Sequence, residues 1–193
     1  MFGLPGSSAP ATTTIDEFFL EPLTTDHVEL DYAAVMDTRE WLREWSGSTW
    51  PADDFTVDEN REDLARHQRE HEEGVAFTFT VLRSDRSECL GCVYLADTDR
   101  LAEANPDLIG RLPTGAAVLG LWVRRSHPAP DAVDRLLTGV LDWLGREWEF
   151  PAVYLAVRSA DERHQAPAAR AGLAVEAQVT VPGRNGIFDL YRG

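Results

Sequence analysis

Residues 116–148 constrain the fold more than any other part of the chain. A mostly apolar run, 116–123, is followed by Arg124 and Arg125, a short loop, and a helical pattern over 131–148. Apolar residues recur in that pattern at i, i+3, i+4 and i+7, which predicts a helix with one face packed on a sheet. A strand, a basic loop and a helix start together can bind an anion, because the first helical turn has unpaired N–H groups.

The remaining elements alternate around this unit. We expect strands over 18–23, 76–82, 89–96, 153–157, 173–181 and 187–191, helices over 24–36, 56–73 and 161–171, and an irregular connection over 97–115. This order predicts an α/β protein with one twisted, mixed sheet of six to seven strands and about four flanking helices, on both faces. Residues 1–15 are predicted to be a flexible tail, and 16–193 one domain.

Two capping boxes mark helix starts in the first half. Thr56 and Glu59 begin the helix over 56–73, and Asp37 with Glu40 is expected to begin a further helical turn. The helix over 56–73 is very polar, and only a weak stripe follows helical spacing. The members of that stripe are Val57, Asn60, Leu64, His67 with Gln68, and His71. The stripe predicts a helix that lies over a cleft instead of inside a core.

Cys89 and Cys92 form a lone C-x-x-C. Side chains alternate along a strand, so residues three apart are expected on opposite faces. A single C-x-x-C without a second half favours two reduced packing cysteines over a metal site. We therefore predict that the protein holds no metal.

The charge is strongly negative and uneven. The net charge is −15, residues 1–110 carry −16, and all 18 basic residues are arginines, which excludes lysine nucleophiles. Nucleic acids and anionic membranes attract basic surfaces, so neither is an expected partner. The acidic half either serves solubility alone or faces a cationic ligand. No apolar run approaches the roughly 20 residues of a membrane span, and the first residues do not resemble a secretory signal, so a cytoplasmic location is expected.

Four motifs occur in a specific order: F-x-L-x-P-L-T at 18–24, L-G-C-V-Y at 90–94, L-G-L-W-V-R at 119–124 and A-x-x-A-G-L at 168–173. With the element order, they make residues 18–193 similar to the GNAT superfamily of N-acetyltransferases. The resemblance implies that acetyl-CoA lies where strands 119–123 and 153–157 splay apart. It also implies that backbone groups of Val123 and Arg125 pair with the pantetheine arm, that loop 125–131 cradles the pyrophosphate, and that a homodimer can form.

The residues that this resemblance places on the cosubstrate are Leu121, Trp122, Val123, Arg124, Arg125, Ser126, Ala129, Asp131 and Arg135. The loop departs from the family's pattern, Q/R-x-x-G-x-G/A. Ala129, Asp131 and Val133 stand at the glycine positions, and the two prolines, 128 and 130, have no N–H to donate. Either the three arginines replace the glycine loop, or Asp131 merely caps the helix and the arginines are solvated.

The catalytic residues of the resemblance are also incomplete. The family's tyrosine falls at Ala168, which leaves Tyr154 and Tyr191 as alternatives. His67 and His71 are the candidate bases, because histidine titrates near neutral pH. Residues expected to bind the amine, from the first two helices and the loop between them, are Trp41, Trp45, Trp50, Asp53, Asp54 and Glu59.

Two functions remain open from the sequence. The first is an acyltransferase that moves an acetyl or other acyl group from acyl-CoA to a primary amine of a cationic small molecule or peptide. The second is a catalytically inactive module with the same fold, which has lost pyrophosphate binding and binds a ligand or protein through its acidic half.

Overall fold

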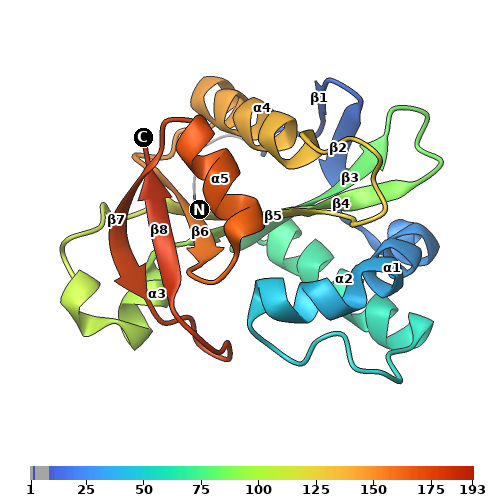
Figure 1. Cartoon of the computed structure of the whole chain (residues 1–193), viewed down its shortest axis with the longest axis horizontal. Helices are drawn as coiled ribbons and strands as arrows, with labels where there is room; N and C mark the ends of the chain where they lie inside the picture. Colours follow the sequence, from blue (N-terminus) through green and yellow to red (C-terminus); the bar gives the residue numbers. More distant parts are fainter. Residues whose placement is uncertain (1, 3–8) are drawn as a thin grey trace.

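The computed structural model describes residues 2 and 9–193, and the strands in this part of the chain form one mixed sheet (Figure 1). Its eight strands there have the order β1-β2-β3-β4-β5-β6-β8-β7. All neighbours are antiparallel except β5 and β6. The expected α/β class and element order are confirmed, and the described part of the chain has eight strands where six to seven were predicted.

The strands are β1 Thr13–Ile15, β2 Phe18–Pro22, β3 Ala76–Arg83, β4 Cys89–Asp97, β5 Ala117–Val123, β6 Val153–Arg158, β7 Ala174–Val179 and β8 Phe188–Arg192. The helices are α1 Val28–Ser46, α2 Val57–Glu72, α3 Asp99–Ala104, α4 Ala132–Glu147 and α5 Glu162–Arg170. Short 3₁₀ turns cover Thr25–His27 and Pro106–Leu108. None of the described helices has the length and apolar character needed to cross a membrane.

Helices cover both faces of the sheet, as predicted (Figure 1). The apolar face of α4 packs on alternate residues of the central strands, including Leu119, Leu121 and Val123 of β5. Trp143 of α4 is fully buried and meets Phe79 of β3 edge-on, with ring centroids 5.0 Å apart. The opposite face carries α1 and α3, packed on the intervening residues such as Trp122.

Helix α1 corrects the prediction of a separate helical turn at Asp37. The helix continues without a break from Val28 to Ser46, so Asp37 lies inside it. A D-x-x-E spacing is also an ordinary i, i+3 pair within a helix, and only tertiary contacts distinguish the two cases. The second capping box is confirmed, since Thr56 Oγ1 accepts from the Glu59 N–H at 3.2 Å and begins α2.

The tail predicted over residues 1–15 is wrong for its last residues. Thr13–Ile15 form β1 and pair with β2, and the side chain of Ile15 packs against α4 next to Gly139. This small apolar contact and the strand hydrogen bonds order a segment whose composition suggested a mobile tail. Residues 1 and 3–8 lie outside the described residues.

Candidate active site

Strands β5 and β6 form a fork. They pair only at Ala117 with Val153, Val118 with Tyr154 and Leu119 with Leu155. Beyond that point β5 continues to Val123 and β6 to Arg158 without pairing to each other. The unpaired stretch of a parallel pair leaves backbone N–H and C=O groups available for a ligand or for other parts of the chain.

Two adjoining cavities lie on the α1–α3 side of the sheet. The fork cavity has a volume of about 360 Å³ and reaches Gly120 and Ala156, the first residue of each strand beyond the last pair. The α1–α2 cavity has a volume of about 450 Å³ and extends from there between the first two helices. Residues that line both are Trp45, Tyr94, Ala96, Arg100, Pro182 and Arg184. Together they lead from the surface to the fork.

The middle of the predicted α2 stripe faces this space, whereas Val57 and His71 at its ends pack against apolar side chains. Asn60, Leu64 and His67 all line the α1–α2 cavity. The Nδ1 atom of His67 lies 3.0 Å from Thr78 Oγ1, and its Nε2 atom lies 3.2 Å from a guanidinium nitrogen of Arg66. Burial and the Arg66 charge lower the pKa of His67 to about 3, so its ring is neutral at physiological pH.

The other two candidate catalytic residues lie elsewhere. His71 packs between α2 and β3, against the rings of Phe77 and Phe79 at 5.1 and 5.2 Å. The Tyr154 hydroxyl lies 3.4 Å from both Glu176 and Arg192, near the β7 edge of the sheet. Neither side chain is among those that line the two cavities.

The backbone groups expected to hold the pantetheine arm are already hydrogen-bonded within the chain. The Val123 carbonyl accepts from Arg163 Nη2 at 3.3 Å, and the Arg125 N–H donates to Thr38 Oγ1 at 3.1 Å. The Arg163 guanidinium lies 4.9 Å from the Trp41 ring centroid. Thus α1 and the start of α5 meet across the open end of the fork, and Trp41 lies there instead of in either cavity.

Two of the three loop arginines are neutralised by carboxylates. Arg124 is 14% exposed and binds Asp37 at 3.2 Å and Glu88 at 2.5 Å. Arg135 binds both carboxylate oxygens of Glu17 at 2.6 Å. Arg125 is exposed and forms no ion pair with any described residue, so it is the cation left for an anionic ligand at this loop.

The start of α4 is closely packed. Ala132 and Val133 are 1% and 4% exposed, and Ala129 packs against the same core. Asp131 is exposed and caps no backbone N–H with its side chain. Ser126 donates to Asp37 at 2.7 Å, which ties the loop to α1. The buried first turn presents little backbone to a phosphate, which matches the absence of glycine in the loop.

Tyr94 is a cavity residue that the sequence analysis missed. It lies on β4 opposite Gly120 of β5, and its hydroxyl accepts from Trp122 Nε1 at 3.1 Å. Burial and the neighbouring Cys92 and Asp31 raise its pKa well above the ordinary value, so the hydroxyl keeps its proton. Its position in L-G-C-V-Y indicated a strand but not that its face borders a cleft.

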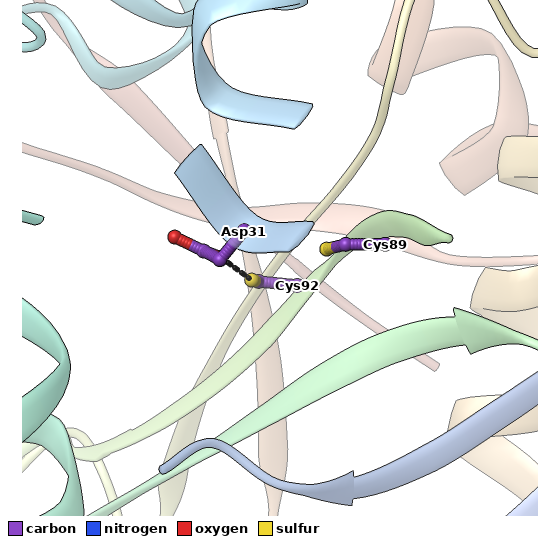
Figure 2. A group of neighbouring side chains, drawn as sticks. All are labelled: Asp31, Cys89 and Cys92. Carbon is purple, nitrogen blue, oxygen red and sulfur yellow. Dashed lines mark hydrogen bonds between the residues drawn. The ribbon is translucent and has the colours of Figure 1, made fainter. Parts of the chain in front are cut away.

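Asp31 of α1, which lines the α1–α2 cavity, lies next to Cys89 and Cys92 of β4 (Figure 2). A carboxylate oxygen of Asp31 and the sulfur atoms of Cys89 and Cys92 all lie within 4.8 Å of one another. The Cys92 thiol donates to Asp31 Oδ1 at 3.5 Å. The prediction that the thiols face opposite ways is wrong, because the β3–β4 register shifts between Val81 and Leu82 and this bulge places both on one face. The hydrogen bond between Cys92 and Cys89, together with burial, raises the pKa of the Cys92 thiol. Metal ligation needs the thiolate form, which a raised pKa disfavours.

The predicted amine-binding residues divide into two groups. Trp50 and Trp45 line the α1–α2 cavity, and Trp50 Nε1 donates to Asp63 at 3.1 Å. Asp53 is largely exposed and pairs with Arg43, while Glu59 is used by the α2 capping box. These two carboxylates, like Asp54, do not line either cavity.

Comparison with known proteins gives a clear structural match. No family model and no curated protein matches the sequence. A RimL ribosomal L7/L12 α-N-protein acetyltransferase in complex with coenzyme A aligns with a TM-score of 0.72 and 16% identity, over 93% of this chain and 96% of that one. A ribosomal-protein-S5-alanine acetyltransferase from Vibrio fischeri aligns at 0.73 and 15%, over 95% and 96%. The microcin C7 self-immunity acetyltransferase MccE, in complex with acetyl-CoA and AMP, aligns at 0.73 and 13%, over 96% and 97%. The chain has the GNAT acetyltransferase fold.

Proposed function

We propose that this protein is an N-acyltransferase that moves an acetyl group from acetyl-CoA to a primary amine of a small molecule or peptide. The observation that carries the proposal is the fork of β5 and β6, with a cavity that leads to it from the α1–α3 side of the sheet. One substrate can then enter along the unpaired edge of β5 and the other through the α1–α2 cavity. The RimL and MccE structures of the same fold contain coenzyme A and acetyl-CoA, which supports this assignment.

The chain's own residues account for parts of such a reaction. Acetyl-CoA would supply the activated thioester carbonyl. Arg184 lines the fork cavity, with its guanidinium 5.7 Å from the Trp45 ring centroid and no ion-pair partner among the described residues. A positive charge there disfavours a protonated amine and favours the neutral amine that can attack a carbonyl. His67 is the predicted base that lines the cavity; its low pKa keeps its ring neutral but makes it a weak proton acceptor, so the proton transfer is not assigned to it.

Acetyl-CoA binding tests this function directly. Calorimetric titration at low salt is expected to give measurable affinity, and Arg125→Ala is expected to weaken it about tenfold, because a charge-assisted contact to phosphate is lost. Arg146→Ala is the matched control, since Arg146 is exposed on α4 and bonds only the Asp142 carbonyl. Release of free CoA thiol with a panel of amines then measures turnover. Absence of heat at millimolar acetyl-CoA contradicts the proposal.

A second function is favoured by one specific observation. Arg163 and Thr38 occupy the Val123 carbonyl and the Arg125 N–H, the two backbone groups on which the pantetheine arm was expected. In a protein that has lost acyl transfer, such internal bonds would replace the cosubstrate permanently. The cavities would then serve a non-catalytic ligand or partner.

Arg163→Ala separates the two functions. In a working transferase it frees the Val123 carbonyl, and acetyl-CoA affinity is expected to rise about fivefold, because one net hydrogen bond contributes about 1 kcal/mol. Arg170→Ala on the same helix is the control, since Arg170 is exposed and binds Asp134. If acetyl-CoA binds neither the wild type nor Arg163→Ala, the non-catalytic function stands.

A further inference from the structure

We propose that Asp31 and Asn60 form a subsite for an ammonium group, so that the acceptor is an aliphatic diamine or an amine with a second cationic group. Both residues line the α1–α2 cavity, and neither lines the fork cavity. The inference deepens the proposed function, because it takes the reacting amine to lie at the fork and assigns the subsite to the other end of the same molecule.

Asp31 is a buried carboxylate without a counter-ion. It is 3% exposed, and no arginine or histidine of the described chain lies within ion-pair distance of it. Its two oxygens accept only neutral donors, Asn60 Nδ2 at 3.0 Å and the Cys92 thiol at 3.5 Å. Burial raises its pKa, which is the expected response of a carboxylate that lacks a cation. A bound cation would compensate that charge.

Asn60 supplies a second, independent sign of a missing ligand. It is 1% exposed, and its Oδ1 atom is buried with no hydrogen-bond partner. The amide orientation is fixed, because Nδ2 donates both to Asp31 and to the Val28 carbonyl at 3.3 Å. An unpaired buried carbonyl oxygen destabilises the folded protein, so a hydrogen-bond donor at this place is favoured.

The chemistry of the free groups matches an ammonium. An alkylammonium has three N–H donors and no acceptor, whereas Asp31 and Asn60 offer only acceptor oxygens. Trp45, Trp50 and Tyr94 line the same cavity and suit both an alkyl chain and a cation. The other carboxylates at this cavity are already paired, Asp63 and Glu70 with Arg66, and Glu70 also with Arg100. Asp31 is therefore the carboxyl group of this cavity that has no cationic partner among the described residues.

Charge also orients the ligand. Arg184 lines both cavities and has no ion-pair partner among the described residues, while Asp31 lines only the α1–α2 cavity. A diamine would place its protonated end at Asp31 and its other nitrogen, in neutral form, beside Arg184. This is the protonation pattern that acyl transfer needs, since only the neutral nitrogen is a nucleophile.

Calorimetry without acetyl-CoA tests the subsite. Diamines from 1,3-diaminopropane to 1,6-diaminohexane are titrated into the full-length protein, each beside the monoamine of equal carbon number. At least one diamine is expected to bind ten times more tightly than its monoamine. Asp31→Asn, which keeps the shape, is expected to remove that difference, and Asn60→Ala to reduce it. Asp53→Asn removes an exposed carboxylate outside the cavity and is expected to change nothing.

The outcomes distinguish this inference from the proposed function. Equal affinity of every diamine and its monoamine for the wild type overturns the subsite, whatever acetyl-CoA does. Diamine binding that is unchanged in a folded Asp31→Asn variant also overturns it. Cys89→Ser is expected to keep diamine binding; a site that instead takes Zn²⁺ and loses it in Cys89→Ser would be a metal site and would overturn the ammonium assignment. Diamine binding without acetyl-CoA binding leaves the subsite standing and removes only the acyltransferase function.

Discussion

Gly91→Ala is expected to lower the free energy of unfolding by about 3 kcal/mol. Gly91 lies on β4 opposite Val123 of β5. A Cβ atom at Gly91 would lie 2.9 Å from the Trp122 carbonyl carbon and 3.2 Å from the Val123 Cα, and it would overlap the Trp122 carbonyl oxygen. All three atoms are backbone, so no side-chain rotation relieves the overlap and β5 itself must move.

The displaced segment is the unpaired arm of the fork. Gly91→Ala is therefore expected to abolish acetyl-CoA binding wherever the wild type shows it, in addition to lowering the urea midpoint. Gly145→Ala is a matched control of opposite sign. Gly145 lies exposed in α4 with no atom within 4 Å of an added Cβ, and alanine there is expected to stabilise the protein by about 0.5–1 kcal/mol. A Gly91→Ala protein within 1 kcal/mol of the wild type would show that the two strands are not held this closely.

Local patterns predicted the elements well where one periodicity dominated. The stripe on α4 and the Thr56–Glu59 capping box needed no information from distant parts of the chain. The prediction at Asp37 was wrong because the same spacing occurs within a continuous helix. The orientation of Cys89 and Cys92 was wrong because a bulge depends on the partner strand, which the spacing of two cysteines does not reveal.

The candidate site was less predictable for a related reason. The sequence identified Arg124 and Arg135 as cations near the loop, but their carboxylate partners Asp37 and Glu17 lie 87 and 118 residues away along the chain. Whether an arginine is free for a ligand depends on such distant pairs. Tyr94 and Asp31 were missed because their value as site residues comes from the cavity they border. By contrast, the middle of the α2 stripe, Asn60, Leu64 and His67, was placed correctly over a cleft because the unusual polarity of this helix was a local signal.

His67 is expected to make the protein less stable in mild acid. Its pKa is 6.5 in an unfolded chain and about 3 in the folded protein, so the folded state excludes a proton that the unfolded state binds. The contribution to stability is fully present above pH 6.5 and is lost as the pH falls toward 3. At pH 5 the loss is about 2 kcal/mol, from 1.36 kcal/mol for each pH unit below 6.5.

The physical cause of this loss is local and can be isolated. Protonation of Nε2 would break its contact with Arg66 and place two cations 3.2 Å apart in a half-buried site. His67→Gln cannot titrate and retains hydrogen-bonding groups for Thr78. The difference in unfolding free energy between the wild type and His67→Gln, measured by urea denaturation, is therefore expected to shift by about 2 kcal/mol to the disadvantage of the wild type between pH 7.5 and pH 5. His71, with its pKa also lowered by burial, and Asp31, with its pKa raised, titrate in both proteins and cancel in the difference. A pH-independent difference would mean that His67 is more open to solvent than its contacts with Thr78 and Arg66 indicate, and it would restore a base of ordinary strength to the cavity.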